Sequence, residues 1–166
     1  MLAADPVLAL LLFLHVFGAI VAFGPTYAFI LLGPMSGREP QHANFAIRFQ
    51  HLISSRVILP LAVFQGITGL LLIWKTGINV FATTWLLVAI VLYLIALAIG
   101  FAVLLPTASK LVEATSTPPP PPQPGEPPRQ GPPPHIAALV RRARMAGMTN
   151  AILILVIVFL MVTKPF

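Results

Sequence analysis

The sequence contains no cysteine and very little charge. Only four acidic and ten basic residues occur among 166, so 8% of the chain is charged, against about 25% in soluble domains. Without cysteine the chain has no disulfide, no thiolate metal site and no thiol nucleophile. Since 58% of the residues are hydrophobic, a soluble fold of this size could not cover the apolar surface. The composition therefore indicates a membrane protein.

The acidic residues are not only few but also lie outside every long apolar run. They are Asp5, Glu39, Glu113 and Glu126. Carboxylates inside membranes commonly carry protons or coupled cations, and paired carboxylates catalyse many hydrolytic reactions. Their absence from the apolar runs disfavours an enzyme, and it makes a small solute transporter or channel the least favoured class of function.

Four uncharged apolar runs are present, at residues 7–32, 57–74, 81–105 and 145–163. About 20 apolar residues in a helix cross the hydrocarbon core of a bilayer, which is about 30 Å thick. The sequence therefore predicts an all-α fold, a polytopic membrane protein built as a bundle of four transmembrane helices. The glycine- and proline-containing stretch at residues 33–37 predicts a turn after the first of them.

Residues 41–56 alternate with a helical period between apolar and polar side chains. Phe45, Phe49, Leu52 and Ile53 fall on one face, and the other face carries Asn44, Arg48, His51 and Ser55. Two interpretations stay open. The segment is either a short amphipathic helix at the level of the lipid headgroups or an extension of the second span.

Residues 117–134 are rich in proline, with 11 prolines in the 17 residues from 118 to 134. Such a segment has little apolar surface to bury and favours an extended polyproline II conformation. We expect a stiff cytoplasmic linker between the third and fourth spans, with recognition of its Pro-x-x-Pro pattern by a partner as the alternative.

Basic residues are distributed unevenly between the two sides of the membrane. Two lie on the side of the termini, Lys75 and Lys164, and eight lie on the other: Arg38, Arg48, Arg56, Lys110, Arg129, Arg141, Arg142 and Arg144. The positive-inside rule then places both long loops in the cytoplasm and both termini outside. This pattern predicts a multi-pass protein of the cell inner (plasma) membrane.

Several of these arginines are also candidates for contact with anionic lipid headgroups. They are Arg48, Arg56, Arg141, Arg142 and Arg144. Their position at the ends of the spans already explains them as anchors that set the topology. A nucleic-acid partner is not indicated, because the basic residues form no separate domain.

Small residues recur at helical spacing on every span, which is typical of helix–helix contacts in membranes. The candidates for helix packing are Gly18, Ala22, Gly66, Gly69, Ala96, Gly100, Ala143, Gly147 and Ala151. These residues favour packing within the chain, in a homo-oligomer or against another membrane protein.

His15 is the one ionisable side chain well inside a predicted span. It could ligate haem b, bind a quinone headgroup or donate a hydrogen bond between helices. Haem b usually needs a second axial ligand at a similar depth, and His42, His51 and His135 all fall near the other membrane surface. The sequence predicts no metal site. The other polar groups in the spans that could bridge helices are Gln65, Thr68, Tyr93 and Asn150.

Short motifs in the spans resemble a known family. They are Leu14-His15 with Gly18 and Gly24, a glycine-bearing second span, Trp85 at the start of the third, and Met161 to Pro165. Together they resemble the bacterial integral membrane proteins called domain of unknown function 2269, which implies a four-helix membrane protein without an assigned activity. More distantly, the chain is similar to copper-resistance D-like membrane proteins, and that similarity implies His15 as a ligand.

Two hypotheses about function remain. The preferred one is a non-enzymatic membrane component that packs against itself or a membrane complex, because small-residue faces occur on every span. The alternative is a redox protein that binds haem b or quinone through His15, with the ligand set completed across a homo-oligomer.

Overall fold

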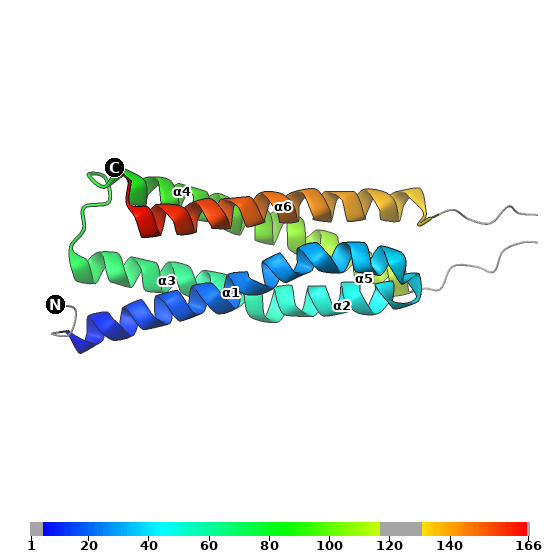
Figure 1. Ribbon diagram of the computed structural model, residues 1–166, viewed down its shortest axis with the longest axis horizontal. Coiled ribbons are helices and arrows are strands. Elements are labelled where there is room, and N and C mark those ends of the chain that lie inside the picture. Colours follow the sequence, from blue (N-terminus) through cyan, green and yellow to red (C-terminus); the bar gives the residue numbers. More distant parts are fainter. Residues whose placement is uncertain (1–4, 117–130, 166) are drawn as a thin grey trace, which may run out of the picture.

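The computed structural model describes residues 5–116 and 131–165, whose regular secondary structure is entirely helical (Figure 1). The α-helices are α1 (Pro6–Arg38), α2 (Ala43–Ile53), α3 (Leu59–Thr76), α4 (Thr84–Ile99), α5 (Leu105–Ser116) and α6 (Pro134–Thr163). A 3-10 turn, η2 (Pro40–His42), joins α1 to α2. A π-helical turn, η3 (Ser54–Ile58), connects α2 to α3, and another, η4 (Gly100–Leu104), connects α4 to α5. Most of the Pro-rich linker predicted at residues 117–134 lies outside the described residues.

Because η3 and η4 keep their helices continuous, the described residues form four long apolar helices of 30 to 34 residues, each able to cross a membrane. The prediction of an all-α, four-helix membrane protein is confirmed. At about 1.5 Å per residue these helices are about 45–50 Å long. This length matches a whole bilayer with its headgroup layers, about 40–45 Å, when the helices are tilted.

Each π-helical turn precedes a proline. Pro60 follows η3, Pro106 follows η4, and neither residue can donate a backbone hydrogen bond to the turn before it. The helices continue because Leu59 and Leu105 donate one residue further back, to the carbonyl groups of Ser54 and Gly100. In lipid, a broken helix would leave more backbone groups unpaired than this local widening does.

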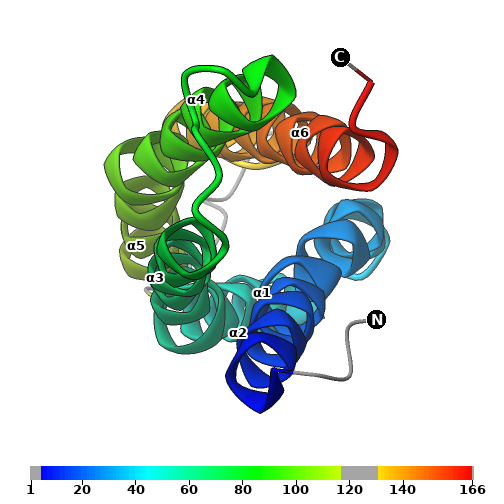
Figure 2. The ribbon, with the colours of Figure 1, turned by 90° about the vertical axis from the view of Figure 1, so that its left-hand side faces the viewer.

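The four long helices associate as two pairs (Figures 1 and 2). Along one half of the bundle α1 packs against α3 and α4 against α6, and along the other half α2 packs against α5. Both termini lie at one end of the bundle, which we call the terminal end. The opposite end carries η2 and the starts of α2 and α6, and we call it the basic end.

Two expectations about the region after the first span are resolved. The turn predicted at residues 33–37 is wrong, because α1 continues through Pro34 and Gly37 to Arg38 and the chain turns at residues 39–42. The Ser36 hydroxyl donates to the Leu32 carbonyl (2.9 Å) inside this continuous helix. The segment at residues 41–56 extends the second span, since α2 runs into α3 through η3.

The small residues predicted to pack helices differ in burial. Gly18, Ala22, Ala96, Gly100 and Ala151 are buried. A Cβ added at Gly100 would come within 2.9 Å of Leu59 Cδ2, so α3 and η4 approach each other closely where the two π-helical turns begin and end.

The remaining small residues divide into two groups. Gly66 and Gly69 each face a large side chain of a neighbouring helix, and a Cβ at Gly66 would lie 2.5 Å from the Tyr93 hydroxyl oxygen. Ala143 and Gly147 are partly buried on α6, and a Cβ at Gly147 would meet no atom within 4 Å.

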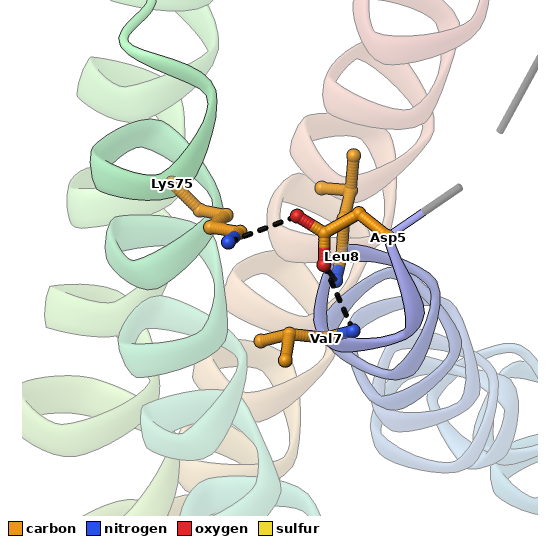
Figure 3. A network of polar contacts seen from close by, with 4 residues as sticks. All are labelled: Asp5, Val7, Leu8 and Lys75. Carbon is orange, nitrogen blue, oxygen red and sulfur yellow. Dashed lines mark hydrogen bonds and ion pairs between the residues drawn. The ribbon is translucent and has the colours of Figure 1, made fainter. Parts of the chain in front are cut away.

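Ion pairing at the terminal end ties the start of α1 to α3 (Figure 3). Asp5 caps α1, because Oδ1 accepts hydrogen bonds from the backbone amides of Val7 (3.0 Å) and Leu8 (3.1 Å). Its Oδ2 lies 2.9 Å from Lys75 Nζ. The Lys75 ammonium group, with the backbone amide of Leu8, lowers the pKa of the Asp5 carboxyl below its ordinary value of 3.8.

We predict that acid loosens the start of α1. Because the folded-state pKa of Asp5 is lowered, its contribution is complete above pH 3.8 and is lost as the pH falls through the lowered pKa. Amide hydrogen-exchange protection at Val7 and Leu8 should therefore fall in that acidic range. Asp5→Asn keeps an oxygen that can cap the helix but removes the charge, so its protection should not change with pH there. Equal acid sensitivity of both proteins would contradict the assignment.

Candidate functional site

A polar cluster lies where α1 crosses α3. His15 Nδ1 is 2.9 Å from Thr68 Oγ1, and Thr68 Oγ1 lies 3.1 Å from the carbonyl oxygens of both Phe64 and Gln65. A carbonyl can only accept, so the threonine hydroxyl donates to these carbonyls and accepts from His15. His15 therefore carries its proton on Nδ1, and Nε2 keeps a free lone pair.

The two helices approach closely because each places a glycine opposite a polar side chain of the other. A Cβ at Gly69 of α3 would lie 3.3 Å from His15 Cε1, and a Cβ at Gly18 of α1 would lie 2.9 Å from Gln65 Oε1. A larger residue at either position would collide with these side chains. We call the set of His15, Gly18, Gln65, Thr68 and Gly69 the crossing cluster.

Gln65 is the polar side chain of the crossing cluster whose oxygen lacks a partner among the described residues. Its side chain is deeply buried, with 7% of the residue exposed, and Oε1 has no hydrogen-bond partner among the described residues. His15 is partly buried. The cluster therefore holds two acceptors, His15 Nε2 and Gln65 Oε1, whose complementary chemistry is an O–H or N–H donor.

Two tyrosines join other pairs of helices. The Tyr93 hydroxyl donates to the Ala62 carbonyl (2.8 Å), linking α4 to α3, and the Tyr27 hydroxyl donates to the Ala151 carbonyl (3.2 Å), linking α1 to α6. The sequence pattern indicated Tyr93 but missed Tyr27. The signal available for Tyr27 is a phenol in the middle of an uncharged span, where it needs an acceptor.

The other predicted polar groups do not join the crossing cluster. Asn150 Oδ1 on α6 is buried without a partner among the residues the structure describes. His42, His51 and His135 belong to η2, α2 and the first turn of α6, so they occupy the basic end. Within residues 5–116 and 131–165, no three histidine, aspartate or glutamate side chains gather to hold a metal ion.

Haem b would therefore find one axial ligand, His15, among the described residues of a single chain. His15 lines neither of two hollows in the described chain. One of about 300 Å³ is lined by Leu12, Phe13, Val16, Phe17 and Ile20 of α1. A second, of about 140 Å³, lies at the turn between α1 and α2.

The basic residues predicted as lipid anchors lie at the basic end and are exposed. They are Arg48 and Arg56 on the second long helix, and Arg141, Arg142 and Arg144 on α6. Among the described residues the ion pair recorded is that of Lys75 with Asp5, at the terminal end. Lys164 lies 5.7 Å from the centroid of the Trp85 ring at the terminal end, so both basic residues there are engaged.

Comparison with known proteins identifies the kind of chain. A family model described as "Predicted integral membrane protein (DUF2269)" matches residues 9–165. No curated protein and no solved structure matches the chain. The more distant similarity to copper-resistance D-like proteins therefore stays a prediction.

We predict that Thr68→Val weakens the contact between α1 and α3. Valine has a similar shape but cannot accept a hydrogen bond from His15 Nδ1. The free energy of unfolding in detergent should therefore fall by about 1–2 kcal/mol. Thr68→Ser keeps the hydroxyl and is the matched control. A double-mutant cycle with His15→Ala separates the pair from other effects, and additive losses would show that the two residues do not interact.

Proposed function

The chain belongs to the DUF2269 family of predicted integral membrane proteins, and we propose that it is a non-enzymatic membrane component. It acts by packing against itself or against a membrane complex. The lipid bilayer is its surrounding, and the four long helices hold it there.

The use of the intramembrane polar groups carries this proposal. His15, Tyr27 and Tyr93 each bridge two helices of the same chain. Polar side chains in membranes commonly act in this way, each contributing about 0.6–2 kcal/mol. Together with the buried glycines and alanines, these three side chains hold the helices of the bundle against one another.

Gly147 supplies a surface for a partner. It lies between Ala143 and Ala151 at intervals of four residues, and an added Cβ would meet nothing within 4 Å. Ala151 is buried against the rest of the chain, so only one end of this row of small residues packs within the chain. A second helix could approach α6 closely at Gly147.

The charge distribution supports an inner-membrane location with both termini outside the cytoplasm. The terminal end keeps two basic residues, each engaged by Asp5 or Trp85. Exposed arginines gather at the basic end, as the positive-inside rule requires of a cytoplasmic surface.

Co-purification tests the preferred function. The full chain, tagged and cross-linked in native membranes, should purify as a homo-oligomer or with one membrane protein in fixed ratio. Gly147→Leu should remove that association and leave the unfolding temperature unchanged, because the position is open. Gly24→Leu is the matched control, since a Cβ there also meets nothing within 4 Å. A chain that purifies alone after cross-linking would contradict the proposal.

A ligand function is the second candidate, and the orientation of His15 favours it. Ligating histidines almost always donate their other ring N–H to a fixed acceptor, and Nδ1 donates to Thr68 in this way. Nε2 then presents a lone pair to haem or to a quinone headgroup. Of the two, the hydroxyl of a reduced quinone fits the acceptors of the crossing cluster.

Absorbance and quinone extraction separate the two candidates. If His15 binds a cofactor, purified protein carries a Soret band or extractable quinone, and His15→Ala loses it. That result would contradict a purely architectural role. A colourless and quinone-free preparation would instead contradict the ligand function.

A further inference from the structure

The α2 helix has its polar side turned inward and its apolar side turned outward. Asn44 donates to the Thr115 carbonyl (2.9 Å) and hydroxyl (3.0 Å) on α5, and His51 Nδ1 is buried. Phe45, Phe49 and Leu52 are exposed, Phe45 to 72%. A helix surrounded by water would show the reverse arrangement, so the outward face of α2 contacts lipid.

Two arginines lie along that outward face: Arg48, which the sequence pattern assigned to the polar face but which is exposed, and Arg56, which follows α2 in η3. Phe45, Arg48, Phe49, Leu52 and Arg56 follow one another at steps of three, one, three and four residues, which keeps them on one side of a helix. The rings of Phe45 and Phe49 stack with centroids 6.3 Å apart. Arg48 and Arg56 are exposed. We call these five residues the α2 lipid face.

The depth of these residues places the arginines near the headgroup layer. With Thr76, the end of α3, at one membrane surface, Arg56 lies about 30 Å along the helix and Arg48 about 42 Å along it. A bilayer with its headgroup layers is about 40–45 Å thick, so Arg48 lies in the opposite headgroup layer and Arg56 lies just below that layer. Long arginine side chains reach from such positions to the phosphate groups.

The charge of the face is not neutralised by the protein. Glu39 and Glu113 are the acidic residues of the described basic end, and neither pairs with Arg48 or Arg56 in the part of the chain that the structure describes. Beside Phe45 lies the hollow of about 140 Å³, which is lined by apolar residues such as Leu32, Met35 and Ala46 and also by Ser36, Glu39 and His42. A cationic, aromatic face with a recess complements a negatively charged lipid.

We propose that the α2 lipid face binds an anionic phospholipid. Arg48 and Arg56 donate hydrogen bonds to headgroup phosphate oxygens, which suit the planar guanidinium group. Phe49 lies beside Arg48 at the level of the headgroups, and Phe45 lies one helical turn further out. The site is separate from the crossing cluster and from Gly147, so it does not depend on either candidate function.

Native mass spectrometry of the full-length protein tests this site. The detergent-solubilised, delipidated chain is titrated with phosphatidylglycerol and, separately, with phosphatidylcholine. Arg48→Gln/Arg56→Gln should lower the association constant for phosphatidylglycerol on the order of twentyfold, from about fivefold per basic residue. Binding of phosphatidylcholine should change far less. Equal losses for the two lipids would overturn the proposal.

Matched variants separate a defined site from general attraction. Arg141→Gln/Arg142→Gln removes the same charge from the same end of the bundle, and a loss as large as that of the α2 pair would also overturn the proposal. Arg48→Lys/Arg56→Lys keeps the charge and should retain intermediate affinity, which guards against misfolding of the glutamine variant. Inorganic phosphate should not displace the lipid, and displacement at millimolar concentration would indicate a site for free phosphate instead.

Discussion

Close approach of α1 and α3 at their crossing is the contact on which the bundle depends. Lipid offers no hydrophobic force between helices, so packing and hydrogen bonds must hold them together. Gly18 and Gly69 remove the side chains that would separate the two backbones. The resulting proximity lets His15 reach Thr68. Between α3 and α4, Gly66 likewise leaves room for the Tyr93 hydroxyl, which donates to the Ala62 carbonyl.

The same environment explains the shape of the basic end. Backbone groups in a membrane must be satisfied internally, so the helices continue past Pro34, Pro60 and Pro106 instead of breaking. The continuous second helix carries α2 beside α5, where its polar side finds Thr115. Its aromatic side is left outside. An arrangement that would be unstable in water becomes the expected one beside lipid.

The sequence was sufficient for the fold class, because four uncharged runs have one physical explanation. It was not sufficient for the end of the first helix, since residues 33–37 have the composition of a turn and yet continue α1. It indicated His15 and Thr68 separately as polar groups in spans. Their pairing could not be foreseen, because it depends on the rotation of two helices that glycine contacts set. Tyr27 was missed for the same reason, since its acceptor is a backbone carbonyl.

The energetics of the crossing cluster bear on its role. One interhelical hydrogen bond contributes about 0.6–2 kcal/mol in a membrane, whereas a buried polar group without a partner costs about 1–3 kcal/mol. The cluster forms one such bond, between His15 and Thr68, and buries Gln65 Oε1 without a partner among the described residues. As a device for joining α1 and α3 alone, this cluster is inefficient, because an apolar contact over the two glycines would avoid the cost.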